Sequence, residues 1–381
     1  MDRILVVRGG ALGDFILGLP ALQRLRNRFP RSHLEVMAPS AVLPLASQLA
    51  NRLAPLDGGE ISALFGDPRF LPEEIAARYR GLDLAVLWLS DAEGSMRRSF
   101  EMLGARRILW SPALPPAGRH ATDHLLSTLE PLGIPCPASG GAQAGASGVV
   151  GTFVLSSPES YPPAPVVRPS HAALERASHL WCDLGLGDGR LAVVVHPGSG
   201  GDWKRWPVER FALVIDHLTE AGVGAVLVQG PADADVVPRV VGCIRGKRPP
   251  VVSGLGVEEL AALLSLASCY LGNDSGVTHL SAAVGTPTVA IFGPTDPAQW
   301  APRGGHVVVL RSEQECAPCG GTRGAVCPRR LCLESIGVER VTEVVLRQTG
   351  LAVQRSVSPP SSGREARLFN CHNRPQRSSS P

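Results

Sequence analysis

Short runs of apolar residues alternate with stretches of helical spacing over the first hundred residues of the chain. Apolar runs at 4–7, 33–37 and 82–89 predict buried strands, and residues 15–29 repeat apolar side chains near one helical face. Short apolar strands separated by helices indicate a parallel sheet that is covered on both faces. The pattern therefore predicts an α/β domain at the N-terminal end of the chain.

The second half repeats the same alternation more regularly. Strands are expected over residues 191–195, 225–229, 251–253, 269–271 and 288–292. Helices are expected from Pro207 to Gly222, from about Asp233, from Val257 to Leu266, and after Gly276 to about Gly285. Repeated strand–helix units at short intervals predict a second doubly wound domain.

Composition divides the chain into parts. Residues 135–170 are rich in Gly, Ala, Ser and Pro, and we expect them to be irregular and linker-like. We therefore predict an N-terminal domain over 1–170 and a C-terminal domain over 171–350. The tail, 351–381, is rich in Ser, Pro and Arg and is expected to be disordered. Two Rossmann-like domains in tandem would face each other across a cleft, where ligands bind beyond the carboxyl ends of the strands.

Length and charge narrow the class of protein. The 381 residues have room for about two domains, and the hydrophobic (44%) and charged (19%) fractions are those of a globular chain. A formal net charge of +3 does not indicate nucleic-acid binding. No apolar run approaches the roughly 18–20 residues of a membrane span, and the first residues lack a signal-peptide pattern. Together with nine mostly scattered cysteines, which fit a reducing compartment, these features predict a cytoplasmic protein.

A glycine-rich loop, Arg8-Gly9-Gly10-Ala11-Leu12-Gly13-Asp14, follows the first expected strand. It is not the dinucleotide fingerprint, which would need a glycine at position 8, and it is not a P-loop, because no Lys-Ser or Lys-Thr follows. A tight turn here brings the backbone close to a ligand and presents the carboxylate of Asp14 at a helix start. Asp14 either caps that helix or faces the ligand.

A second loop, residues 196–207, reads His-Pro-Gly-Ser-Gly-Gly-Asp-Trp-Lys-Arg-Trp-Pro. Its small residues let backbone amides approach an anion, Ser199 offers a hydroxyl, and Lys204 offers an ammonium group. The alternative is a surface loop with solvated charges. The density of Gly, Ser and Lys before a helix start favours a phosphate site.

A third loop runs from Gly272 to His279 between a strand and a helix. Ser275 and Gly276 present free N–H groups at the positive end of that helix, which favours a bound diphosphate. His279 lies one turn further and could reach the same phosphate, although a lone helical histidine is more often core or surface. Asp274 could accept hydrogen bonds from sugar hydroxyls or form an Asx turn.

Other candidates carry a weaker signal. Asp233, in the loop after strand 225–229, could bond a ribose hydroxyl or cap a helix. A set of basic residues in the first half could hold an acidic acceptor or form a solvated face. This set consists of Arg97, Arg98, Arg106, Arg107, Arg119 and His120.

These loops, in this order and spacing, resemble glycosyltransferase family 9, the lipopolysaccharide heptosyltransferases. The resemblance covers residues 3 to about 346. It rests on Gly10 to Asp14, on the His-Pro-Gly-Ser segment leading to Lys204-Arg205-Trp206-Pro207, and on Asn273-Asp274-Ser275-Gly276 with His279. The segments Gly285-Thr286-Pro287 and Phe292-Gly293-Pro294-Thr295 continue it.

The resemblance implies a GT-B fold and an inverting transfer of heptose from an ADP-sugar. Asp14 then matches the general base, and Gly10 and Gly13 lie on the acceptor side. The implied donor contacts are Ser199, Gly200, Lys204, Asp274, Ser275, Gly276, Val277 and His279, with Asp233 near the ribose. The acceptor would be a lipid A/Kdo-type or core oligosaccharide, or another envelope glycan, met by peripheral contact with the inner membrane. No cofactor is implied for catalysis.

Four late cysteines, Cys316, Cys319, Cys327 and Cys332, have a spacing that could ligate a structural zinc ion. The seven-residue middle spacing is short for a standard zinc ribbon, and reduced cysteines or a partly formed cluster are the alternatives.

Three other functions compete with a transferase. A GT-B nucleotide-sugar epimerase would isomerise the donor without an acceptor, and a non-catalytic binding protein would hold a nucleotide-sugar without turnover. An NAD-dependent oxidoreductase is disfavoured because no GxGxxG follows a strand.

Overall fold

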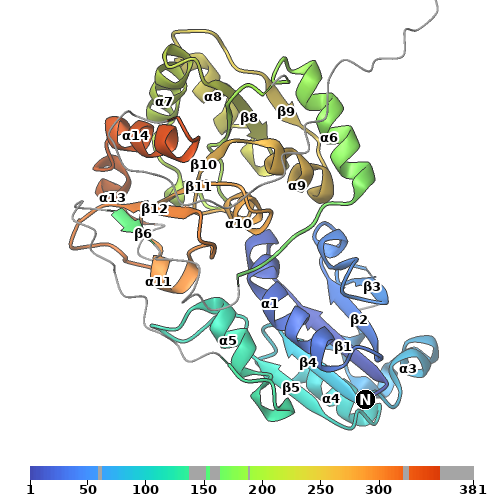
Figure 1. Ribbon diagram of the computed structural model, residues 1–381. Helices are drawn as coiled ribbons and strands as arrows, with labels where there is room; N and C mark the ends of the chain where they lie inside the picture. Colours follow the sequence, from blue (N-terminus) through green and yellow to red (C-terminus); the bar gives the residue numbers. More distant parts are fainter. Residues whose placement is uncertain (59–61, 137–151, 155–163, 188, 321–325, 352–381) are drawn as a thin grey trace, which may run out of the picture.

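The computed structural model describes residues 1–58, 62–136, 152–154, 164–187, 189–320 and 326–351. These residues form two sheets, each with helices on its faces, as Figure 1 shows. Both sheets are built mainly from parallel strands, so the prediction of two doubly wound α/β units is confirmed.

The first sheet has five parallel strands in the order β3-β2-β1-β4-β5. The strands are β1 (Arg3–Arg8), β2 (His33–Ala38), β3 (Arg52–Pro55), β4 (Leu84–Trp88) and β5 (Ile108–Ser111). The helices of this part are α1 (Leu12–Arg28), α3 (Glu73–Tyr79), α4 (Ser95–Met102) and α5 (Ala121–Ser127). Short 3₁₀ turns also occur at Leu43–Ala46, Ala63–Phe65, Pro68–Phe70 and Glu130–Leu132. The central strands are apolar and buried, as their sequence requires in a covered parallel sheet.

The second sheet has seven strands in the order β6-β12-β11-β10-β7-β8-β9. Their bounds are β6 (Thr152–Val154), β7 (Ala192–His196), β8 (Gly224–Gln229), β9 (Val251–Ser253), β10 (Cys269–Asn273), β11 (Thr288–Phe292) and β12 (Val307–Arg311). Only the edge strand β6 is antiparallel to its neighbour, β12.

Strand β6 corrects the expected division of the chain. Residues 135–170 were expected to be irregular and to belong to the N-terminal half, but 152–154 pair with 308–310 of the second sheet. Three residues within a Gly- and Ala-rich stretch carry no periodic signal, so only the pairing with β12 identifies them as a strand. The expected disordered tail falls outside the described residues, apart from Leu351.

Helices cover both faces of the second sheet. The longer ones are α6 (His171–Asp183), α7 (Val208–Glu220), α8 (Val236–Cys243), α9 (Val257–Leu266), α10 (Gly276–Ala283) and α14 (Val338–Gln348). Two short helices, α11 (Pro297–Trp300) and α13 (Leu331–Glu334), and 3₁₀ turns at Asp202–Lys204 and Pro231–Asp233 complete this part. Within the described ranges, no helix is both long and apolar enough to cross a bilayer.

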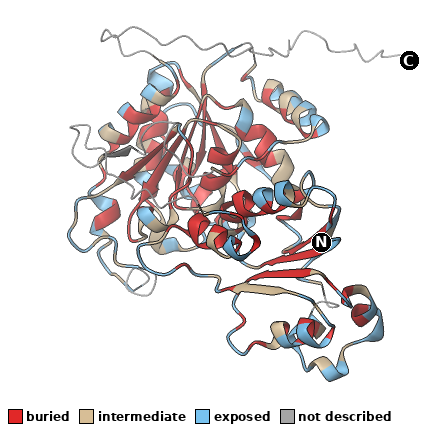
Figure 2. Cartoon of the chain, turned by 60° about the horizontal axis from the view of Figure 1, so that its bottom comes forward, coloured by how far each residue is buried: buried red, intermediate tan, exposed pale blue. Residues whose placement is uncertain are grey.

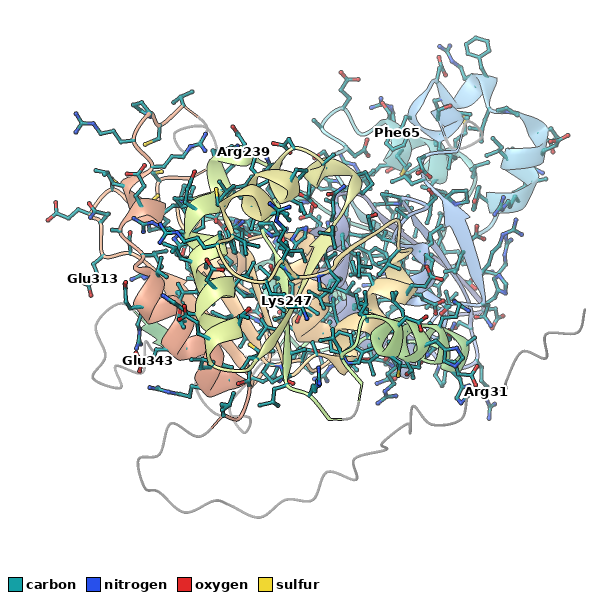
Figure 3. The ribbon with its side chains drawn as sticks, turned by 90° about the horizontal axis from the view of Figure 1, so that it is seen from above. Arg31, Phe65, Arg239, Lys247, Glu313 and Glu343 are labelled. Carbon is teal, nitrogen blue, oxygen red and sulfur yellow. The ribbon has the colours of Figure 1, made fainter. Side chains whose placement is uncertain are left out.

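The burial pattern follows the layers. Buried residues, coloured red in Figure 2, make up most of the sheets and the inner faces of the helices. Charged residues such as Arg239, Lys247 and Glu343, labelled in Figure 3, are exposed.

Strand order determines where a ligand can bind. In the second sheet, β7 and β10 are neighbours. The chain continues from β7 to β8 on one side and from β10 to β11 on the other, so the loops that follow β7 and β10 diverge. In the first sheet the same reversal falls between β1 and β4. A crevice opens at such a point, and the three glycine-containing loops follow β1, β7 and β10.

Helices α1 and α10 pack against each other at the junction of the two parts (Figure 1). Ile16 and Leu19 of α1 belong to the same buried apolar cluster as Leu280 and Ala283 of α10. The two parts of the chain therefore share a continuous core at this contact.

A buried ion pair ties the same two parts together. The guanidinium of Arg303 donates two hydrogen bonds, of 2.7 and 2.6 Å, to the carboxylate of Asp123 at the start of α5. Both side chains are almost fully buried (7% and 6% exposed). Burial, together with the charge of Arg303, lowers the pKa of His120 to about 3. His120 is therefore neutral and donates from Nε2 to the carbonyl of Ala301.

We predict that Arg303→Met strongly lowers the free energy of unfolding. The substitution leaves the Asp123 carboxylate buried and without its partner, which typically costs roughly 3–5 kcal/mol. Chemical denaturation of both proteins measures the difference.

The matched control is Arg347→Ala, which breaks the exposed pair with Glu343 on α14 and should change stability by less than about 0.5 kcal/mol. Equal losses in the two variants would show that the buried pair does not secure the junction.

Candidate functional site

A cavity of about 240 Å³ opens where the two parts of the chain meet. It receives residues from the start of α1, from the loop after β7, and from the start of α10. Its lining consists of Ala11, Gly13, Asp14, Leu17, Gly200, Lys204, Asp274, Ser275, Gly276, His279, Thr295 and Trp300. Eight of these were candidate site residues in the sequence: Gly13, Asp14, Gly200, Lys204, Asp274, Ser275, Gly276 and His279.

Asp14 is both a helix cap and a cavity residue. Its Oδ2 accepts a hydrogen bond of 2.9 Å from the backbone N–H of Ala11, the residue just before α1. The side chain remains one-third exposed and lines the cavity. Gly10 enters this turn with φ of +100°, and a Cβ there would lie 2.7 Å from Cβ of Asp14. The glycine therefore makes room for the carboxylate without itself lining the cavity.

Arg8 supports this loop from beneath. Its buried guanidinium donates to the carbonyl oxygens of Asp14 and Trp88, and Nη2 lies 3.9 Å from Oδ1 of Asp14. Burial lowers the pKa of Arg8, and the charge of Asp14 acts in the opposite direction. The arginine remains charged, so a fixed positive charge lies behind the carboxylate.

The N-terminus of α10 forms another part of the cavity wall. Ser275 caps this helix by accepting a hydrogen bond from the N–H of Thr278. The first N–H groups of the helix have no partner within it and carry the positive end of its dipole. They lie at the cavity, where they can bind an anion.

Lys204 and Asp274 form an ion pair in the cavity wall. Nζ of Lys204 is 3.0 Å from Oδ2 of Asp274, and the hydroxyl of Thr295 donates to the same oxygen at 2.8 Å. Lys204 is only one-quarter exposed. An ammonium group has three N–H donors, so Lys204 can keep its bond to Asp274 while it binds a phosphate oxygen.

His279 is buried behind the start of α10 and is 5% exposed. Its Nδ1 is buried and has no hydrogen-bond partner among the residues that the structure describes. Burial lowers its pKa, with Asp274 and Asp14 opposing the effect, so the ring is neutral near pH 7. A neutral imidazole at this place can donate to or accept from a ligand in the cavity.

Ser199 and Asn273 link the loop after β7 to the end of β10 by hydrogen bonds. Ser199 is buried and donates to the carbonyl of Asp274 at 2.8 Å, so its hydroxyl is used within the protein. The Asn273 amide donates to the carbonyl of Pro197 and accepts from the N–H of Trp206. Asn273 was part of the quoted motif but received no role, because its partners lie on another loop. Thr295 and Trp300 also line the cavity, and the sequence did not predict this, because both follow β11 and lie far along the chain from most of the other lining residues.

Two other expected donor contacts lie away from the cavity lining. Val277 is partly buried within α10 and packs against the junction core. Asp233 is buried and paired with His196 through a bond of 2.8 Å between Oδ2 and Nε2. A role for either residue in ligand binding stays a prediction, and the Asp233 carboxylate already has partners within the protein.

The basic residues of the first half do not line the cavity. Arg97 lies over the ring of Trp110 and near Asp91, while Arg106 pairs with Asp83. Arg107 donates to a backbone carbonyl. His120 is buried at the junction and is not solvated.

The four late cysteines line one cavity of about 180 Å³ with Trp203 and Pro294. Within the described part of the chain, no three His, Cys, Asp or Glu side chains are arranged to hold a metal ion. The four cysteines therefore lie around one cavity, but they are not arranged as a set of metal ligands. A structural zinc stays a prediction that metal analysis of the purified protein would test.

The arrangement can bind an anion and accept a proton within one cavity. Lys204 and the start of α10 provide positive charge, and Asp14 of α1 provides a carboxylate in the same lining. This pairing suits a displacement in which a negative group leaves on one side and a hydroxyl loses its proton on the other.

Comparison with known proteins agrees with the geometry. The sequence model of "Glycosyltransferase family 9 (heptosyltransferase)" matches residues 155–326. Lipopolysaccharide heptosyltransferase 3 of Escherichia coli is 27% identical to this chain over 326 residues, covering 78% of this chain and 85% of the relative.

Solved structures show the same fold. The crystal structure of a family 9 glycosyl transferase from Veillonella parvula matches with a TM-score of 0.71 and 23% identity, covering 92% of this chain and 98% of that one. ADP-heptose lipopolysaccharide heptosyltransferase II of Escherichia coli matches with a TM-score of 0.66 and 18% identity, covering 92% and 99%. The expected GT-B fold is confirmed.

We predict that Gly276→Ala destabilises the contact between α1 and α10. An added Cβ would lie 2.7 Å from Cβ of Leu12 and 3.0 Å from the backbone nitrogen of Gly13. Overpacking of this kind costs typically about 1–3 kcal/mol, which denaturant unfolding measures.

Gly242→Ala is the control, because a Cβ at that helical glycine meets no atom within 4 Å. It should leave stability unchanged or raise it by up to about 1 kcal/mol through helix propensity. If Gly276→Ala behaved in the same way, the two helix starts would not be in tight contact.

Proposed function

The chain belongs to glycosyltransferase family 9, and we propose that it transfers a heptose from ADP-heptose to a lipopolysaccharide core or related envelope glycan. One observation carries the proposal: Asp14 of α1, Lys204 and the start of α10 line a single cavity. The relatives support the choice of substrates, since they are named for lipopolysaccharide and, in one solved structure, for ADP-heptose.

The donor diphosphate lies against the second sheet in this proposal. Its oxygens accept hydrogen bonds from the N–H groups at the start of α10 and from Lys204. These contacts become more favourable as the bond to the sugar breaks and negative charge collects on the departing ADP. His279, which is neutral and lines the same cavity, is the third contact that we propose for this group.

The acceptor hydroxyl approaches from the side of α1. The Asp14 carboxylate takes its proton while the hydroxyl oxygen attacks the anomeric carbon, and the carbon–oxygen bond to the diphosphate breaks on the opposite face. A single displacement of this kind inverts the anomeric configuration. Arg8 behind the loop and the Ala11 N–H hold the carboxylate in place for this step.

We propose that no metal ion takes part in the transfer, because Lys204 and the helix N–H groups supply the positive charge that a leaving diphosphate needs. The late cysteines lie in a separate cavity.

A lipid-linked acceptor also requires peripheral contact with a membrane. Phe70, which is 81% exposed, and Phe65 lie with Arg69 on the N-terminal part of the chain. Exposed apolar rings suit a peripheral interface with lipid, while the charge of Arg69 is paired with that of Asp67, and co-sedimentation with vesicles would test this contact.

The alternatives fit the site less well. An epimerase acts on the donor alone and has no need of a carboxylate on the acceptor side, and family membership does not favour it. A non-catalytic binding protein would release no ADP. Release of ADP that depends on an added acceptor therefore distinguishes a transferase from both.

We predict that Asp14→Asn keeps donor binding and abolishes transfer. The amide can accept the same hydrogen bond from Ala11 but cannot take the acceptor proton. Loss of general-base catalysis lowers the rate by roughly 10²–10⁴-fold. An assay of acceptor-dependent ADP release measures the rate, and calorimetry with ADP measures binding.

Lys204→Ala provides the contrast, because it should weaken ADP binding itself. Normal turnover by Asp14→Asn would mean that Asp14 is only a helix cap, and the proposed mechanism would be wrong.

A further inference from the structure

Two buried polar side chains, Asp233 and His196, form a row with the partly buried Ser275 from the second sheet to the start of α10. His196, at the end of β7, is 3% exposed. Its Nε2 lies 2.8 Å from Oδ2 of Asp233, and its Nδ1 lies 3.4 Å from Oγ of Ser275. Ser275 lines the cavity, whereas His196 and Asp233 lie outside its lining. The row therefore connects the cavity to a buried carboxylate.

Asp233 fixes one end of the row. Its Oδ2 also accepts from the N–H of Gly230 at 3.1 Å, and a Cβ at position 198 would overlap its Oδ1. Burial raises the pKa of this carboxyl, but the hydrogen bonds from His196 and Gly230 and the nearby positive charge of Arg205 together outweigh burial, and the net shift is downward. Asp233 is thus an ionised acceptor, and Nε2 of His196 must carry a hydrogen.

Nδ1, the other ring nitrogen of His196, can either carry a hydrogen or lack one. In a neutral His196, Nδ1 has no hydrogen and accepts the hydroxyl hydrogen of Ser275. In a protonated His196, Nδ1 donates to Oγ of Ser275, and the hydroxyl hydrogen must turn elsewhere. The Ser275 oxygen also accepts from the N–H of Thr278 and lies 3.1 Å from Oγ1 of Thr278. The Thr278 hydroxyl donates to the carbonyl of Asn273, so Oγ1 of Thr278 competes with a bound anion for the Ser275 hydroxyl hydrogen.

We propose that His196 is a positioning residue that binds a proton when the donor diphosphate binds. The protonated ring, held between Asp233 and Ser275, directs the Ser275 hydroxyl hydrogen toward the diphosphate. This inference rests on the proposed function, because it takes the anion at the start of α10 to be the donor diphosphate. A bound anion is stabilised by a positive charge on His196 and by the hydrogen-bond donor that Ser275 then offers. Binding of the anion therefore favours protonation of His196, and the protein takes up a proton.

The charged and titratable groups around His196 are consistent with one added proton. Asp233 faces the ring from the turn after β8. Tyr270 of β10 has its pKa raised by burial first and, to a smaller extent, by the nearby Asp233 carboxylate. Arg205, in the loop after β7, binds Asp235 and the carbonyls of Ser199 and Ala232. On the cavity side, the Lys204–Asp274 pair and neutral His279 complete the set.

The sign of the pH dependence follows from the row. At low pH, His196 is protonated in both the free protein and the complex, and the affinity for the sugar donor is highest. At higher pH, His196 is protonated only in the complex, so the affinity falls as pH rises, by at most about tenfold per pH unit for one linked proton.

The test is calorimetry of ADP-heptose binding without acceptor, between pH 6 and 8.5 and in pairs of buffers with different ionisation enthalpies. The diphosphate diester of ADP-heptose has no group that titrates in this range, so proton uptake reports on the protein. We expect the wild type to take up part of a proton on binding, and His196→Gln to take up measurably less at each pH.

Substitutions of Ser275 separate the row from a general structural effect. Ser275→Ala keeps His196 but removes the hydroxyl, so we expect it to bind ADP-heptose without the uptake due to His196. Ser275→Thr keeps the hydroxyl and should restore the uptake. If His196→Gln does not fold, the Ser275 pair still decides the matter.

Equal proton uptake by wild type, His196→Gln and Ser275→Ala would overturn the inference while leaving the proposed donor in place. Absence of ADP-heptose binding by the wild type would instead reject the proposed function, and the inference with it.

Discussion

The close contact between the first turns of α1 and α10 is the constraint on which the site depends. Gly13 and Gly276 allow the two helix starts to approach, because a Cβ at position 276 would meet the backbone of Gly13. One helix brings the Asp14 carboxylate and the other brings its unbonded N–H groups and its positive dipole end. Opposite charges from different halves of the chain therefore face a single cavity, and the proposed transfer follows from this pairing.

The fold maintains this contact with two kinds of interaction. An apolar core continues from α1 into α10, and the buried pair of Asp123 with Arg303 joins the halves at a second place. The loops after β7 and β10 lie at the reversal of strand order, where a crevice is expected, and Asn273 binds them to each other. The cavity is thus built on regular elements, while the loops only complete it.

Sequence periodicity predicted what is local. The helix over 257–266 and the strand over 288–292 were predicted to the residue, since both have strong periodic or apolar patterns bounded by turn residues. Strand β6 was missed because three residues acquire their structure only by pairing with β12. Asp233 was read as a helix cap or a ribose contact, because nothing near it in the sequence shows that β7 and β8 are neighbours and bring His196 within 2.8 Å. The positions of glycines and charged residues identified the loops of the site. Which residues distant in sequence contact each other could be known only from the order of strands in the sheet.

The anomeric configuration of the product tests the central claim most directly. If Asp14 activates the acceptor on the side opposite the departing diphosphate, the new glycosidic bond has the configuration opposite to that of the donor. Nuclear magnetic resonance of the product formed from ADP-heptose of known anomeric configuration measures this, and the account predicts inversion. A product with retained configuration would contradict the account, because it would require a second displacement, or attack from the side of Lys204 and α10.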